Sequence, residues 1–175
     1  MNHGFEIAPT GRSKCRGCSE TIAKGDVRFG EVIPNPYAEG ETTLWFHPQC
    51  GAYTRPEPFL EAIAEPPDAE FALDLPSLER DAKNGAEHRR LPRLTSAMRS
   101  PSGRAKCRCC RESIAKDEWR FGLLYYEDGR FEASGYVHAT CSEEYFGTAD
   151  VVDRARHFSS LSEQDCAELS AALAD

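Results

Sequence analysis

Two sets of metal-ligand residues constrain this chain more than any other feature of its sequence. Each set is Cys-x-x-Cys followed by His-x-x-Cys, with 28 intervening residues in the first set and 27 in the second. The members are Cys15, Cys18, His47 and Cys50 in one set, and Cys107, Cys110, His138 and Cys141 in the other. Three thiolates and one imidazole complete the tetrahedral shell that Zn²⁺ prefers. The pattern therefore predicts two structural zinc ions per chain.

An internal repeat surrounds both sets. Residues 11–30 return as residues 103–122 with thirteen of twenty positions identical, at a spacing of 92. The segment 45–50 is answered more weakly by 136–141, at a spacing of 91. Such self-similarity is typical of a duplicated module. Each module is close to the smallest size that a hydrophobic core stabilises alone, so a metal ion is expected to supply much of its stability.

The coarse pattern of each module predicts an α+β fold. Strands are expected at 27–33, 44–47, 119–126 and 130–138, and helices at 49–53, 141–146 and 162–173. We therefore expect two small zinc-stapled modules, each a short antiparallel sheet with C-terminal helices. The expected domains are a first module at 1–88, a basic linker at 89–102 that contains two prolines, and a second module at 103–175.

The charge of the chain is unevenly distributed. The formal net charge is −8, yet residues 88–111 contain eight Lys and Arg and no acid. A polyanion responds to the local field within about 8–10 Å rather than to the total charge. No stretch is apolar enough to span a membrane, and the N-terminus does not resemble a secretion signal. We therefore expect an intracellular protein in which six of the eight cysteines bind metal, rather than a protein held together by disulfides.

The residues around the two ligand sets resemble a known family. The motif Gly-Arg-x-x-Cys-x-x-Cys-x-x-x-Ile-x-Lys-x-x-x-Arg, followed by an aromatic residue and His-x-x-Cys, occurs twice. It resembles the poly(ADP-ribose) polymerase-type zinc finger, which implies recognition of DNA breaks, nicks or ends without reading of sequence. In that family arginines grip backbone phosphates, and by position these are Arg12, Arg28, Arg104 and Arg120 here. Lys14 and Lys106 would add longer-range attraction. As the alternative, these cations are solvated charges or partners of nearby acids.

The resemblance also implies apolar side chains that cover the exposed base pair at a break. The matching positions in the first module, Ala38 and Thr42, are small, but Tyr37 is adjacent. The second module has Phe131 beside Arg130. We therefore include Tyr37, Arg130 and Phe131 among the candidate DNA-binding residues, with ordinary packing as an equal alternative for both aromatic rings.

These observations favour a non-enzymatic protein that binds DNA in the nucleoid or nucleus. The four-ligand zinc sites leave no position for activating water, and no phosphate-binding Gly loop or nucleophile motif occurs. The alternatives are a DNA-bridging or compacting protein, since two fingers can hold two duplexes, and a protein-interaction zinc module, which the acidic middle and tail would suit. A redox sensor based on Cys109 is a further alternative if Arg108 and Arg111 lower the pKa of its thiol. The sequence identifies no protein partner.

Overall fold

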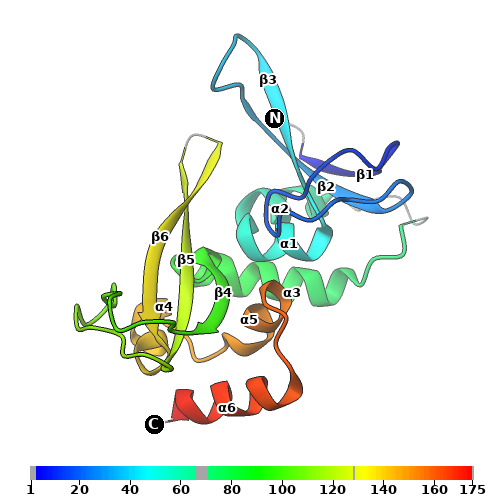
Figure 1. Cartoon of the computed structure of the whole chain (residues 1–175). Helices are drawn as coiled ribbons and strands as arrows, with labels where there is room; N and C mark the ends of the chain where they lie inside the picture. Colours follow the sequence, from blue (N-terminus) through cyan, green and yellow to red (C-terminus); the bar gives the residue numbers. More distant parts are fainter. Residues whose placement is uncertain (1–2, 66–70, 128, 175) are drawn as a thin grey trace. The chain divides into compact units, whose positions relative to one another are not determined.

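The computed structural model describes residues 3–65, 71–127 and 129–174, and its fold is α+β. It contains two compact units, one of residues 1–87 with 127–129 and the other of residues 88–126 with 130–175. Each unit contains a three-stranded antiparallel sheet, with strand order β1-β2-β3 in the first and β4-β5-β6 in the second (Figure 1). The predicted fold class, two sheets with helices and two groups of metal ligands, is confirmed. None of the helices in the described ranges has the length and apolar character needed to span a bilayer.

The first unit packs three helices with its sheet. Its elements are β1 (Gly4–Ile7), β2 (Val27–Pro34), β3 (Glu41–Phe46), α1 (Pro48–Thr54), α2 (Pro56–Ala64) and α3 (Leu75–Glu87). Aromatic rings fill the core: the centroid of Phe29 lies 5.9 Å from that of Phe46 and 5.1 Å from that of Phe59. All three rings are fully buried. Because Phe29 is on β2, Phe46 ends β3 and Phe59 is on α2, this cluster joins the sheet to the helical layer (Figure 1).

The second unit repeats this plan with a different set of helices. Its elements are η1 (Leu91–Arg93), β4 (Leu94–Arg99), β5 (Trp119–Glu127), β6 (Arg130–His138), η2 (Ala139–Cys141), α4 (Ser142–Phe146), α5 (Val152–Phe158) and α6 (Glu163–Ala174). Phe121, Phe146 and Leu169 belong to one buried cluster, so strand, short helix and last helix share a core. Metal ligands lie at the edge of this cluster, with Cys107 inside it and Cys141 packed against it.

The segment 89–102 differs from the linker expected from its prolines and basic residues. It forms η1 and β4, and β4 pairs with β5 in antiparallel register. Leu91 and Leu94 are fully buried and Ala97 nearly so, which explains why the segment folds: three apolar side chains contribute to the core of the second unit. Four arginines in the segment, Arg89, Arg90, Arg93 and Arg99, make it look like a surface stretch and obscure this apolar spacing in the sequence.

Strand β4 is the counterpart of β1 in the first unit, although the repeat seen in the sequence does not include either strand. Glu6 on β1 faces Arg28 on β2, and Met98 on β4 faces Arg120 on β5. These residue pairs are related by the same spacing of 92 as the repeat. The structural repeat therefore begins upstream of residue 11, in β1 and β4, where no residue of β1 is identical to its counterpart at this spacing and only the strand register is shared.

Candidate metal centres and nucleic-acid interface

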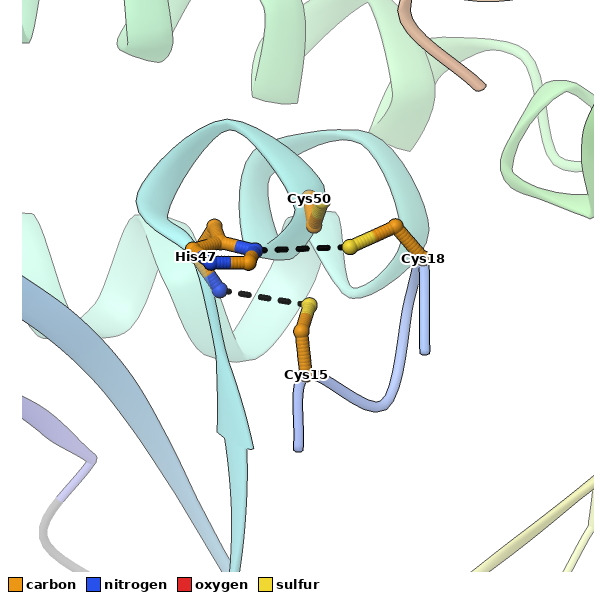
Figure 2. Close-up of side chains that lie close together, drawn as sticks. All are labelled: Cys15, Cys18, His47 and Cys50. Atoms are coloured by element: carbon orange, nitrogen blue, oxygen red, sulfur yellow. Dashed lines mark hydrogen bonds between the residues drawn. The ribbon is translucent and has the colours of Figure 1, made fainter. Parts of the chain in front are cut away.

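The first group of ligands meets where a tight turn faces the end of strand β3. Cys15 and Cys18 lie on the turn, and Ser19 closes it with a left-handed φ of 66° and a hydrogen bond from its amide to the carbonyl of Cys15 at 2.9 Å. His47 follows β3, and Cys50 lies on α1. Figure 2 shows the four side chains pointing toward one another, and their ligand atoms all lie within 4.8 Å of one another.

The imidazole of the first group is oriented by the group itself. Nδ1 of His47 lies 3.4 Å from Sγ of Cys18, and the backbone amide of His47 donates to Sγ of Cys15 at 3.3 Å (Figure 2). The distance from Nδ1 to Sγ of Cys18 suits two atoms that bind one central ion, because neighbouring vertices of a tetrahedron with bonds of about 2.0–2.3 Å are about 3.3–3.8 Å apart. The amide of His47 is not a ligand, and its hydrogen bond supports the sulfur of Cys15 from outside the ligand set. Nδ1 is therefore the nitrogen that faces the metal position.

The second group has the same construction. Its four ligand atoms also lie within 4.8 Å of one another, and Arg111 takes the left-handed role of Ser19 with a φ of 72°. Nδ1 of His138 lies 3.4 Å from Sγ of Cys110 and 3.7 Å from Sγ of Cys141. The opposite ring nitrogen, Nε2, lies 3.3 Å from the carbonyl oxygen of Ser113 and donates to it. That outer hydrogen bond holds the tautomer in which Nδ1 is free to bind a metal.

The local chemistry supplies the thiolates that zinc requires. The hydrogen bond with Cys50 is the main cause that lowers the pKa of the Cys15 thiol to about 4. Burial raises the pKa of the Cys107 thiol, but backbone amides of His138, Cys110 and Cys109 outweigh burial and lower it to about 7. Conversely, the hydrogen bond with Cys15 is the main cause that raises the pKa of Cys50. Sulfurs packed this closely cannot all be deprotonated unless a cation balances them, which is what a divalent ion does.

The donor set identifies the ion. Three sulfurs and one imidazole nitrogen in a tetrahedral arrangement suit zinc, and all four vertices come from protein in both groups. The two groups hold two structural zinc ions, as the sequence predicted. A site with four protein ligands holds the polypeptide in shape and has no open position for catalysis.

The predicted phosphate contacts fall into two structural classes. Arg12, Lys14, Arg104 and Lys106 are exposed and flank the first cysteine of each group. Within the described part of the chain, none of these four cations forms an ion pair. The alternative that they pair with nearby acids is therefore not found for these four residues. They lie on segments that are hydrogen-bonded to the zinc turns, since Lys14 bridges to Thr21 and Lys106 bridges to Ser113.

Arg28 and Arg120 belong to the other class, because only 6% and 5% of each residue is exposed. The guanidinium carbon of Arg28 lies 3.6 Å from the ring centroid of Trp45, and that of Arg120 lies 3.6 Å from the ring centroid of Tyr136. The two aromatic residues before the ligand histidines thus each carry a stacked arginine. The resemblance implied phosphate contacts for these two arginines, and no local sequence pattern indicated that the fold would bury them.

The remaining candidates lie on the strands and loops between the ligand pairs. Tyr37 follows β2 and is 75% exposed, the largest exposed fraction among the exposed large hydrophobic residues. Phe131 is half-buried on β6, with its ring centroid 4.9 Å from that of Tyr126, while the neighbouring Arg130 is exposed. Tyr37 is thus the more exposed of the two aromatic candidates, and Phe131 packs beside another aromatic ring.

The expected low pKa of the extra thiol Cys109 is wrong. Burial raises the pKa of Cys109, and the carboxylate of Glu144 raises it further. The nearby arginines do not offset these effects, since Arg108 donates from Nε to the carbonyl of Ser134 instead. A thiol with a raised pKa is a poorer nucleophile at neutral pH, which removes the chemical basis of the suggested redox sensor.

Comparison with known proteins agrees with this site. Residues 6–65 match the family described as poly(ADP-ribose) polymerase and DNA-ligase Zn-finger region. Over 94% of its length the chain is 27% identical to polynucleotide 3'-phosphatase ZDP of Arabidopsis thaliana, of which it covers 27%. Over 96% of its length it is 21% identical to a poly [ADP-ribose] polymerase of Sarcophaga peregrina, of which it covers 19%. It is 26% identical, over 70% of its length, to a poly [ADP-ribose] polymerase of Drosophila melanogaster, of which it covers 14%. The chain thus spans about a quarter or less of the length of these relatives.

Proposed function

Because this chain carries two tandem zinc fingers of the poly(ADP-ribose) polymerase type, we propose that it binds DNA without reading sequence and prefers breaks, nicks or ends. The observation that supports this most is the placement of exposed cations beside both zinc turns, namely Arg12, Lys14, Arg104 and Lys106, none of which forms an ion pair with another described residue. Zinc holds these segments rigid, so the cations need little further ordering when they meet a phosphate. Arginine forms two parallel hydrogen bonds with phosphate oxygens, which makes it the better anchor of the two cation types.

A break offers what an intact duplex does not, an unstacked base pair. Tyr37 is the exposed aromatic candidate for covering it in the first finger. In the second finger the candidates are Phe131 and the adjacent Arg130, which would contact the backbone beside it. Stacking of this kind contributes about 1–3 kcal/mol per base. Stacking would provide the preference for a break over an intact duplex, whereas the arginines would provide affinity for both kinds of DNA.

We propose no catalytic role for the fingers themselves. The matched region is a zinc finger, and each zinc has four protein ligands. The relatives of Arabidopsis thaliana and Sarcophaga peregrina are named as enzymes, but the chain covers only 27% and 19% of them. In an enzyme that contains these two fingers, the fingers would bring the catalytic domain to damaged DNA. The protein would then be located in the nucleoid or nucleus, with the DNA.

The experiment compares three ligands of identical sequence: a covalently closed dumbbell duplex, the same dumbbell with one nick, and a blunt linear duplex. Affinities of the zinc-loaded protein are measured by fluorescence anisotropy across a salt series. Tighter binding to the nicked and linear forms than to the closed form is the expected result. Equal affinity for all three would remove the preference for breaks, and no binding at low salt would remove the function.

A bridging or compacting role is the second candidate, because the chain contains two fingers rather than one. Bridging requires that each finger bind its own duplex. Mixing two differently labelled short duplexes with the protein distinguishes the two outcomes: energy transfer between labels indicates bridging, and its absence at saturating DNA indicates that both fingers serve one molecule. If the protein bound other proteins but bound neither duplex, it would instead be a protein-interaction module.

A further inference from the structure

The turn that opens the second unit has two different sides. Leu91 and Leu94 are fully buried in the core, whereas Arg90 is exposed and Arg93 is half-buried. The backbone amide of Arg93 donates to the carbonyl of Arg90 at 3.1 Å, which closes the 3₁₀ turn of η1. Residues three apart in such a turn lie one above the other, about 6 Å apart along its axis. The two arginines therefore leave the turn on one side and the two leucines on another.

Each of these arginines is stacked on a tyrosine ring. The guanidinium carbon of Arg90 lies 5.0 Å from the ring centroid of Tyr145, and that of Arg93 lies 5.0 Å from the ring centroid of Tyr125. Tyr145 belongs to the buried cluster of the second unit, whereas Tyr125 is 41% exposed on β5. Stacking of this kind holds a guanidinium in place before a ligand arrives, so less side-chain freedom is lost when one binds.

No carboxylate neutralises the positive charge of this segment. Among the described residues, none forms an ion pair or a side-chain hydrogen bond with Arg89, Arg90 or Arg93. By contrast, Arg55 and Arg99 each pair with a glutamate. A guanidinium has five N–H donors in its plane, and stacking on a ring leaves its edges open. The segment therefore offers three cations and ordered donors to an anion from outside the chain.

An unpaired DNA strand is the anion that uses every feature of this surface. Its phosphates form a row, which suits two guanidinium groups about 6 Å apart on one side of a turn. Its bases are free to stack on an aromatic ring or on the plane of an arginine, and Tyr125 exposes such a ring. Bases inside a duplex are already stacked on one another, and an acidic peptide supplies charge without bases. Charge and ring together therefore favour a single strand.

We propose that Arg89, Arg90, Arg93 and Tyr125 form a binding site for single-stranded DNA, which we call the strand site. It lies outside the segments that flank the zinc turns. The inference rests on the proposed function in one respect, that the strand is the unpaired tail beside a duplex end at a break. The cations beside the zinc turns then hold the duplex, and the strand site holds the tail. Ends with an unpaired tail are therefore bound more tightly than blunt ends.

The first test uses a short thymidine oligonucleotide and no duplex. The Nε–Hε signals of Arg90 and Arg93 and the ring signals of Tyr125 are followed by NMR in the full-length, zinc-loaded protein. All are expected to shift and saturate as the oligonucleotide is added. An abasic oligonucleotide and polyglutamate supply charge without bases, and both should leave the Tyr125 ring signals in place. Tyr125 signals that ignore the thymidine oligonucleotide, or that respond equally to the controls, overturn the proposal.

The second test compares a stem-loop duplex that has one blunt end with the same duplex carrying a short thymidine tail, either 3' or 5'. At least one tail is expected to tighten binding by about tenfold in fluorescence anisotropy, as one stacked base can supply. Tyr125→Leu keeps an apolar side chain without the ring, and Arg93→Lys keeps the charge without the planar stack. Each should remove most of the gain from the tail. Lys83→Ala removes an exposed cation from α3 and should keep that gain. Zinc content is measured for every variant.

The outcomes separate the strand site from the proposed function. A protein that prefers nicked and blunt-ended DNA to closed DNA, but gains nothing from either tail, overturns the strand site and leaves the preference for breaks standing. A protein whose Tyr125 responds to the thymidine oligonucleotide, but that has no preference for breaks, keeps the strand site and overturns the proposed function. A gain from the tail that survives in both Tyr125→Leu and Arg93→Lys overturns the assignment of these residues.

Discussion

His138 donates from Nε2 to the backbone carbonyl of Ser113 across 3.3 Å, and this contact turns its other nitrogen toward the sulfur of Cys110. Ser113 itself lies on the segment that bridges back to Lys106. The metal site and the exposed cation beside it are thus parts of one hydrogen-bonded unit. Loss of the metal would therefore disturb the candidate DNA-binding surface as well as the fold.

Removal of one ligand should unfold one finger and spare the other. Cys18→Ser or Cys110→Ser is expected to lower zinc content from two ions to one, because structural zinc in finger peptides contributes about 10–16 kcal/mol of apparent binding free energy. Elemental analysis and NMR of the remaining unit measure the outcome. Cys166→Ser, on α6 outside both groups, is the matched control and should retain two zinc ions. Retention of both ions in Cys110→Ser would contradict the assigned ligand set.

The two zinc ions should be lost to a chelator at different rates. Cys15 and Cys50 are buried in the first group, whereas Cys110 in the second group is exposed. Exposed sulfur lets water and chelator reach the metal, so the second site is expected to empty first. A colorimetric zinc assay under excess chelator should show two phases, and the slow phase alone should remain in Cys110→Ser. A single phase in the wild-type protein would show that exposure does not govern release.

Exposed arginines beside the zinc turns should affect DNA binding and not stability. Arg12→Ala and Arg104→Ala are each expected to lower the salt slope of binding by about 0.9, with about tenfold weaker affinity at moderate salt. Thermal unfolding should be unchanged because neither side chain has a partner in the described structure. Lys83→Ala removes one exposed cation from α3, where Lys83 pairs with Glu79, and serves as the charge-matched control. Equal effects of all three variants would indicate attraction by total charge alone.

The ion pair between Arg55 and Glu31 should be important for the stability of the first unit. Glu31 has a side chain 3% exposed, and Arg55 reaches it from the junction of α1 and α2. Arg55→Ala leaves a buried carboxylate without its cation, which costs about 3–5 kcal/mol. Chemical denaturation of the zinc-loaded protein measures the loss. The double variant Arg55→Met with Glu31→Leu should recover much of that stability, and failure to recover any would show that packing rather than charge dominates.

Phe59 should contribute to the same unit through packing alone. Its ring is fully buried against Phe29 and Phe5, with centroids 5.1 and 5.4 Å away. Phe59→Ala removes this contact and leaves a cavity, so the free energy of unfolding is expected to fall by about 3–5 kcal/mol. Phe59→Leu keeps most of the volume and should cost less. Equal losses in the two variants would contradict a cavity as the cause.

The sequence alone determined the ligands of both zinc ions, the duplication and the α+β class. Those features depend on local spacing, since Cys-x-x-Cys and His-x-x-Cys bring two ligands together within a single turn whatever the rest of the chain does. Tertiary structure decided the remainder. The expected linker became β4 because Leu91 and Leu94 found a core, and Arg28 and Arg120 became buried because cross-strand register set Glu6 and Met98 opposite them. Strand register and burial depend on residues far apart in sequence. No local pattern around either arginine therefore shows that Arg28 has a carboxylate opposite it and that Arg120 does not.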